Sequence, residues 1–149
     1  MAARRILIVA NQTATGPHLK KIVSERMAEG PCTFLLLVPA TPPKGTWTFT
    51  DAEVLETARD RMDQALAGFE GLSAEVEGRV EEGGPLEAVA AYLDSGRYET
   101  DSPIDEIILS TLPAGLSRWL KQDLPHRIAR RHEIPVTHVI GDVASSTTA

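Results

Sequence analysis

The amino-acid sequence predicts an α/β fold, in which a doubly wound, five-stranded parallel sheet lies between two layers of helices, as in Rossmann-like proteins. Short apolar runs rich in β-branched residues recur along the chain, stretches with helical spacing of apolar residues separate them, and turns that contain Pro or Gly mark the joins. Strands buried on both faces of a parallel sheet have this apolar character, and such alternation requires right-handed crossovers. We therefore expect one domain over residues 1–143, followed by a disordered polar tail at residues 144–149.

The stretch at residues 104–109, with the sequence IDEIIL, carries much of this prediction. Its nearly unbroken apolar run suits a central strand. The run ends in a polar turn that contains Pro113, and proline does not continue a central strand. Turns that follow the carboxyl ends of parallel strands are where open α/β sheets bind ligands. This turn is therefore a candidate for a functional site.

The other expected elements follow from the same rules. Residues 6–10 and 33–38 are further apolar strands, and we expect the second to stop at Pro39. Helices begin where proline or a capping box precedes an apolar stripe, at Pro17 and at Thr50-x-x-Glu53. The remaining elements are an exposed loop at residues 40–50, a half-buried edge strand at residues 74–80, helices at residues 86–96, 116–120 and 124–132, and a final strand at residues 135–140.

The composition limits the classes of function. The formal net charge of -6 and the pI near 5.2 argue against a general nucleic-acid or membrane-surface role, because both partners favour basic faces. A single cysteine, Cys32, excludes an internal disulfide and fits a reducing compartment. The apolar run at residues 6–10 is too short for a signal sequence or a membrane span. We therefore expect a cytoplasmic protein.

Several stretches of the chain resemble the universal stress protein family. RRILIVANQT, at residues 4–13, is similar to the family's opening strand and turn. GGPLEAV, at residues 83–89, is similar to its Gly-Asp-Pro-x-x-x-Ile helix start, and IDEIILST and LPHRIARRHEIPVTHV resemble its last two strands and the helix between them. The resemblance extends over nearly the whole chain. It implies the strand order 3-2-1-4-5 and a homodimer that pairs along the last strand, from Val136 to Ile140.

The resemblance is weakest at the nucleotide motif. ATP-binding members of the family carry Gly-x2-Gly-x9-Gly-Ser/Thr after strand 4, where glycine lets backbone amides approach the phosphates. The glycine positions correspond here to Leu109, Leu112 and Gln122, and the Ser/Thr position corresponds to Asp123, whose carboxylate would repel phosphate. Asn11 matches an acid of the family at the end of strand 1. We therefore do not expect ATP to bind in the family's usual way.

The best candidate pocket joins the turns after strands 1 and 4. In the implied strand order the chain reverses direction between these strands, so that their turns face each other across a crevice. Their side chains offer neutral donors and acceptors that suit a ribose, a base edge or another small polar ligand; the alternative is that they only cap turns and helices. The candidate ligand-binding residues are Asn11, Gln12, Thr13, Ser110, Thr111 and Arg118.

Arg118 also belongs to a basic cluster in an otherwise acidic chain. Two or three of its members could bind a phosphate or an acidic partner, because a guanidinium group binds an oxyanion bidentately. The alternative is a solvated helix face, on which cations near the helix C-terminus are favourable. The members of the cluster are Arg118, Lys121, Arg127, Arg130 and Arg131.

No catalytic set and no metal site are expected. The four histidines lack the spacing of a metal site, and the sequence identifies no base for Cys32. We therefore expect a non-enzymatic, homodimeric regulatory or binding domain with no metal, no nucleic-acid partner and no membrane partner. The alternative is a stress protein that binds a nucleotide, ATP or AMP, through a divergent site. A small hydrolase or transferase on the same scaffold is the third hypothesis.

Overall fold

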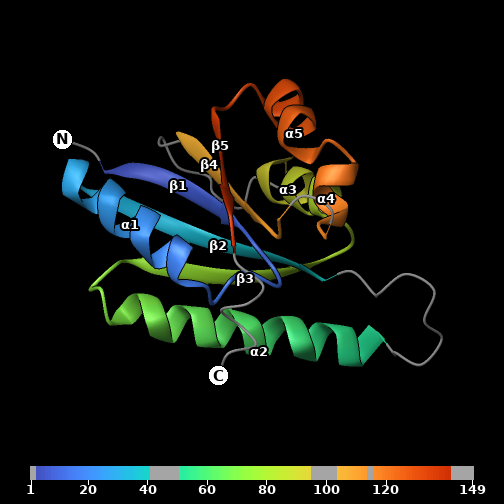
Figure 1. Ribbon diagram of the computed structural model, residues 1–149, viewed down its shortest axis with the longest axis horizontal. Coiled ribbons are helices and arrows are strands. Elements are labelled where there is room, and N and C mark those ends of the chain that lie inside the picture. Colours follow the sequence, from blue (N-terminus) through green and yellow to red (C-terminus); the bar gives the residue numbers. More distant parts are fainter. Residues whose placement is uncertain (1–2, 41–50, 95–103, 114–115, 142–149) are drawn as a thin grey trace.

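The computed structural model describes residues 3–40, 51–94, 104–113 and 116–141. Its strands form one parallel sheet in the order β3-β2-β1-β4-β5 (Figure 1), which confirms the expected fold class and strand order. The loop beyond Ala40 and the tail at residues 144–149 lie outside the described residues. In chain order, the elements are β1 (Arg4–Val9), α1 (Pro17–Glu29), β2 (Cys32–Ala40), α2 (Asp51–Glu70), β3 (Val76–Glu82), α3 (Pro85–Asp94), β4 (Glu106–Thr111), α4 (Arg118–Lys121), α5 (Leu124–His132) and β5 (Val136–Ile140).

Helices cover both faces of the sheet. Figure 1 shows α1 and α2 on one side and α3, α4 and α5 on the other. Alternate residues of the central strands point to opposite faces, so each face has its own core. One core includes Ile6, Ile8, Leu19, Phe69 and Ile108, and the other includes Leu7, Val9, Val89, Leu109 and Ile128. Burial on both faces explains why the sequences of β1 and β4 are almost continuously apolar.

The pairing of β1 with β4 places their carboxyl ends side by side. Val9 is in register with Leu109, so the turn after β1 begins beside the end of β4. Both strands have a paired neighbour on each side, and the switch in strand order lies between them. The topology thus brings together two turns that are about a hundred residues apart in the sequence, Thr13 and Ser110 being separated by 97 positions.

The expectation that β2 stops at Pro39 is wrong. β2 continues to Ala40, and Pro39 is in register with Glu81 of β3. β1 has already ended at this level, because its last residue, Val9, pairs with Leu37. A proline is tolerated in a strand where its nitrogen needs no ladder partner. The carbonyl oxygen of Pro39 accepts a hydrogen bond from the Asn11 side chain at 2.7 Å.

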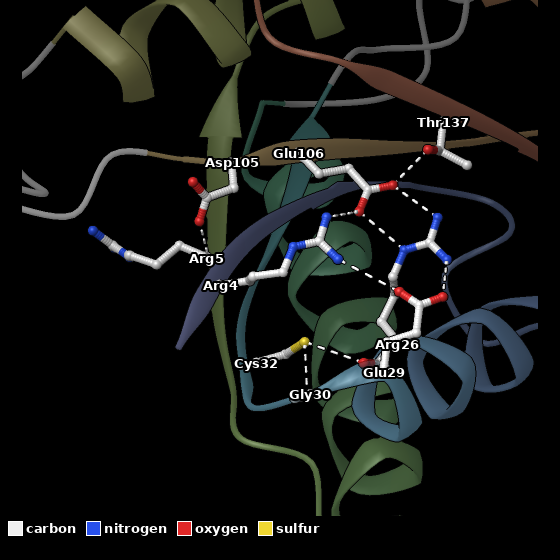
Figure 2. A network of polar contacts seen from close by, with 9 residues as sticks. All are labelled: Arg4, Arg5, Arg26, Glu29, Gly30, Cys32, Asp105, Glu106 and Thr137. Carbon is white, nitrogen blue, oxygen red and sulfur yellow. Dashed lines mark hydrogen bonds and ion pairs between the residues drawn. The ribbon is translucent and has the colours of Figure 1, made fainter. Parts of the chain in front are cut away.

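A buried carboxylate holds the amino end of the central strands together (Figure 2). The side chain of Glu106, which begins β4, is 5% exposed. Arg26 of α1 donates to both of its oxygens, at 3.0 and 2.9 Å. Arg4 of β1 donates at 3.1 Å, and Thr137 of β5 donates at 2.5 Å. One carboxylate therefore connects four elements of the fold.

These contacts decide the charge state of Glu106. Burial is the largest single influence on its pKa and would raise it, but the hydrogen bonds from Arg26 and Thr137 and the charges of Arg26 and Arg4 together outweigh burial. The pKa of Glu106 is therefore lower than usual, and the carboxylate is ionised. The contacts of Glu106 are those of a structural ion pair.

Candidate functional site

The carboxyl ends of β1, β2 and β4 open into a cavity of about 320 Å³. The turns after β1 and β4 form one side of it, and the first turns of α2 form another. Five of the six expected binding residues lie in its wall. Arg118 begins α4 beside the cavity wall formed by Ser117 and Trp119, and its side chain lies outside the described part of the structure. The described lining residues are Asn11, Gln12, Thr13, Ala40, Val54, Thr57, Ala58, Arg61, Ser110, Thr111, Leu112, Leu116, Ser117 and Trp119.

Asn11 connects β2 to α2 across one side of the cavity. Its amide nitrogen donates to the carbonyl oxygen of Pro39 at 2.7 Å. Its amide oxygen accepts a hydrogen bond from Nη1 of Arg61 at 2.5 Å. The bond to Pro39 fixes which end of the amide faces the arginine, because only the nitrogen of the amide donates. Asn11 therefore presents its oxygen to a partly buried guanidinium group, and burial lowers the pKa of Arg61.

Ser110 lies under the cavity between two other polar side chains. Its hydroxyl is 2.5 Å from Oγ1 of Thr13 and 2.7 Å from Nε2 of His18, in the first turn of α1. Ser110 itself is only 1% exposed. Nδ1 of His18 is buried and has no hydrogen-bond partner among the described residues. Burial lowers the pKa of His18, so the ring is neutral near pH 7.

Two glycines make room for the His18 ring. A Cβ atom on Gly16 would lie 2.5 Å from Cε1 and Nδ1 of the ring, and one on Gly141 would lie 2.7 Å from Cε1. Neither distance is compatible with a real side chain unless the ring moves. Glycines from two distant parts of the chain therefore leave the space that the ring in contact with Ser110 occupies.

Thr111 and Ser117 already have hydrogen-bond partners within the protein. Oγ1 of Thr111 lies 2.8 Å from Nε2 of His138 on β5, whose pKa burial lowers. Oγ of Ser117 accepts a hydrogen bond from the backbone nitrogen of Leu120 at 3.2 Å and so caps α4. Part of the cavity lining therefore fits the alternative interpretation, in which these polar side chains only cap turns and helices. Gln12, which belongs to the same expected set, is exposed.

The basic residues of α5 do not take part in the cavity. Arg127, Arg130 and Arg131 are exposed and are not among its lining residues. Their positions favour the interpretation as a solvated helix face. Asp123 precedes α5 in the left-handed conformation, with a φ of 54°, and its carboxylate bonds to Nδ1 of His126 at 2.7 Å.

Arg61, Trp119 and His18 also belong to the site or its surroundings, although the sequence did not predict them there. Arg61 was detectable in principle, because it lies three residues after Ala58 and four before Ala65, on the buried stripe of α2. An arginine on an apolar stripe is a signal that it has a partner or a ligand. Trp119 packs against the core of the α3–α5 face and also reaches the cavity. His18 gave no local signal, since its partner Ser110 is 92 positions away.

Two general features limit the chemistry of the described part. Over residues 3–40, 51–94, 104–113 and 116–141, no three His, Cys, Asp or Glu side chains gather in a way that could hold a metal ion. Among the helices described, none combines the length and apolar character that a membrane crossing requires. The cavity itself offers hydroxyl groups, amides, one guanidinium group and the indole of Trp119.

Comparison with known proteins finds similarity of structure only. No protein-family model and no curated protein sequence matches the chain. A universal stress protein solved in complex with cAMP has a TM-score of 0.58 and 16% identity, covering 95% of this chain and 99% of that one. A universal stress protein from Archaeoglobus fulgidus has a TM-score of 0.60 and 11% identity, covering 93% and 94%. An Arabidopsis thaliana member with AMP bound has a TM-score of 0.57 and 12% identity, covering 95% and 94%. This chain therefore has the fold of the universal stress proteins.

Proposed function

We propose that this chain is a divergent universal stress protein that binds an adenine mononucleotide in the cavity at the ends of β1 and β4. It acts in the cytoplasm as a non-enzymatic regulatory protein. The observation that carries the proposal is the cavity, which lies at the switch in strand order where open α/β sheets bind ligands. Two proteins with this fold were solved with cAMP or AMP, which supports the choice of ligand.

The size and lining of the cavity favour a monophosphate over a triphosphate. Its volume of about 320 Å³ is at the lower end of the range of small-molecule sites, roughly 300–1,000 Å³. Trp119 can cover the face of a base, and the hydroxyl and amide groups can bind a ribose. Leu112 lines the cavity where the resemblance implies a glycine that would approach phosphates. The larger phosphate chain of ATP therefore lacks its usual cradle.

The hydrolase hypothesis depends on the contact between Ser110 and His18. A serine next to a neutral histidine can be a nucleophile. Here, however, the Ser110 hydroxyl also bonds to Thr13, and no described acid contacts Nδ1 of His18 to orient the ring. Ser110 is also almost completely buried. We therefore favour ligand binding over catalysis.

Thermal denaturation with AMP, cAMP, ADP or ATP, each with and without Mg²⁺, tests the proposal. AMP at about a hundred times its Kd should stabilise the protein by about 2.7 kcal/mol, which corresponds to roughly 5–10 °C for a chain of this length. ATP should give a smaller shift at the same concentration. No shift with any of these nucleotides would contradict the proposal.

A cavity-filling variant locates the binding site. Thr57 is exposed on α2 and lines the cavity, so Thr57→Phe should abolish the AMP shift while leaving the melting temperature of the free protein nearly unchanged. Glu56→Phe is the matched control, since Glu56 is the exposed neighbour and is not among the lining residues. An AMP shift that Thr57→Phe leaves intact would place the ligand elsewhere.

We also propose that the protein is a homodimer that pairs along β5. β5 is an edge strand of five residues, and Ile140 on it is 52% exposed. An edge strand with exposed apolar side chains is a site for strand pairing. Light scattering at micromolar concentration should give twice the mass of 16.1 kDa, and Ile140→Lys should return it to the monomer. A monomeric wild-type protein would contradict this proposal.

A further inference from the structure

Arg61 is the one charged side chain among the described residues that line the cavity. We propose that its guanidinium group forms an oxyanion subsite, which binds a phosphate or carboxylate group of the ligand. This inference deepens the proposed function, on which it rests for the location of the ligand, because it names the chemical group that the cavity selects. It also assigns the role to a residue of α2 and not to the turn after β4.

Arg61 is held in place without a ligand. Pro39 fixes the amide of Asn11, and the amide oxygen in turn holds Nη1 of Arg61 at 2.5 Å. An arginine has five N–H donors in a rigid planar arrangement. This chain of bonds uses one of them and orients the plane of the others. Pre-orientation reduces the entropy that is lost when a ligand binds.

Arg61 has no counter-charge among the described residues. None of the described lining residues is acidic, and no described carboxylate forms an ion pair with Arg61. Arg26 at the other end of the sheet shows the contrast, because the carboxylate of Glu106 accepts two of its hydrogen bonds (Figure 2). A partly buried cation that faces a neutral amide is stabilised by an anion that enters the cavity.

Asn11 holds Arg61 through a neutral amide, so the positive charge of the arginine remains available to an anionic ligand. Aspartate has the same shape as asparagine, and its carboxylate in this position would form an ion pair with Arg61. The side chain amide holds the arginine without neutralising it. The pair of Asn11 and Arg61 therefore selects for an anionic ligand in a protein whose net charge is -6.

Nuclear magnetic resonance titration with simple anions tests the subsite directly. Inorganic phosphate and acetate each carry one of the two candidate groups, and sodium chloride at equal ionic strength corrects for general salt effects. We expect phosphate or acetate to shift the Nε–H signal of Arg61 and the amide signals of Asn11 and Gln12. A response to phosphate only indicates a phosphate ligand, a response to acetate only indicates a carboxylate ligand, and both responses support the subsite.

Three variants make the test specific. Arg61→Gln and Asn11→Asp should each abolish the response to the anion, the first by removing the cation and the second by neutralising it. Arg61→Lys, which keeps the charge, should retain part of it. Arg59→Gln is the control, because Arg59 is exposed on the same helix and is not among the lining residues. The dispersion of the amide spectrum shows that each variant is folded.

Comparison of AMP with adenosine separates this inference from the proposed function. Wild-type protein should bind AMP at least about tenfold more tightly than adenosine, or about 1.4 kcal/mol, and Arg61→Gln should bind the two alike. Equal binding of AMP and adenosine by the wild type would overturn the inference and leave nucleotide binding intact. An anion response that depends on Arg61, without binding of any nucleotide, would support the subsite and contradict the proposed function. No anion response in the wild type would overturn the subsite.

Discussion

Polar groups are buried at both ends of β4, but the kind of partner that stabilises them differs between the two ends. At the amino end, the charge of Glu106 is enclosed by two arginines and a threonine from three other elements. At the carboxyl end, Ser110 and Thr111 are neutral and bond to two histidines of lowered pKa. At the amino end, the charge of Glu106 is balanced by ion pairs with arginines. The carboxyl end lies beside a cavity lined by Arg61, for which the described residues offer no counter-charge. The difference distinguishes a structural cluster from the proposed binding site, although both contain buried polar groups.

The largest effect is expected at the amino end. Glu106→Gln keeps the shape of the side chain but removes the buried charge that pairs with Arg26 and Arg4, and leaves Arg26 with only the exposed Glu29 as a described ion-pair partner. Removing one member of a buried ion pair costs about 3 kcal/mol or more, and chemical denaturation should show this loss in the free energy of unfolding. Glu29→Gln is the control, because Glu29 contacts the same arginines but is 54% exposed, and an exposed pair contributes less than about 1 kcal/mol. Equal losses for the two variants would remove the distinction between the ends.

A smaller effect is expected from Ser110→Ala at the carboxyl end. The substitution leaves Thr13 and Nε2 of His18 without the partner that they share. An unsatisfied buried polar group costs about 1–3 kcal/mol, and we expect a loss of about 2 kcal/mol in chemical denaturation. Ser117→Ala is the matched control, because Ser117 also lines the cavity and its described side-chain hydrogen bond is to the backbone of Leu120 and not to a histidine. A loss no larger than that of the control would show that the contact with His18 contributes little.

The same variant decides between binding and hydrolysis. If the protein only binds its ligand, wild type and Ser110→Ala should hydrolyse an activated ester such as p-nitrophenyl acetate at the same background rate. A wild-type rate that exceeds the variant by about a hundredfold or more, the size of effect that acid–base catalysis gives, would restore the hydrolase hypothesis.

Much of the fold could be predicted because its main signals are local. The apolar sequences of β1 and β4 report burial on both faces, which only a central position in the sheet provides. The alternation of charged and apolar residues in β3 likewise reports its position at an edge. Pro39 misled the prediction because its tolerance depends on where the neighbouring strand ends, and that is not a property of the local sequence.

The site was less predictable because contacts between distant residues define it. The polar turns at Asn11 and Ser110 could be paired once the strand order was implied by the resemblance. The partners of those turns could not be, since Arg61 is 50 positions from Asn11 and His18 is 92 positions from Ser110. The rotation of α1 and α2 about their axes brings these two side chains to the turns. Sequence patterns predict which face of a helix is apolar, and much less which polar residue lies at its margin.

The smallest expected effect is a pH dependence that distinguishes the two ends. Burial lowers the pKa of His18 below its value in the unfolded chain, which is about 6.5. The unfolded chain therefore binds the proton more readily, and the stabilisation is present above about pH 6.5 and is lost as the pH falls toward the pKa of the folded state. For one proton the slope is at most about 1.4 kcal/mol per pH unit. Urea denaturation between pH 7.5 and 5.5 should show this loss in the wild type and less of it in His18→Gln.

Glu106 provides the internal control for this measurement, because its pKa is lowered from a different reference value. An unfolded glutamate titrates near pH 4.3, so its stabilisation is complete above that value and is lost only as the pH falls further. Glu106→Gln should thus lower the stability at every pH between 7.5 and 5.5 without changing the slope. A changed slope in Glu106→Gln would contradict the account of the amino end. An unchanged slope in His18→Gln would assign the titration above pH 5.5 to another group, such as His138, whose pKa burial also lowers. The expected pattern would show that the cavity end loses stability by protonation at a higher pH than the amino end, where the ion pairs of Glu106 are still intact.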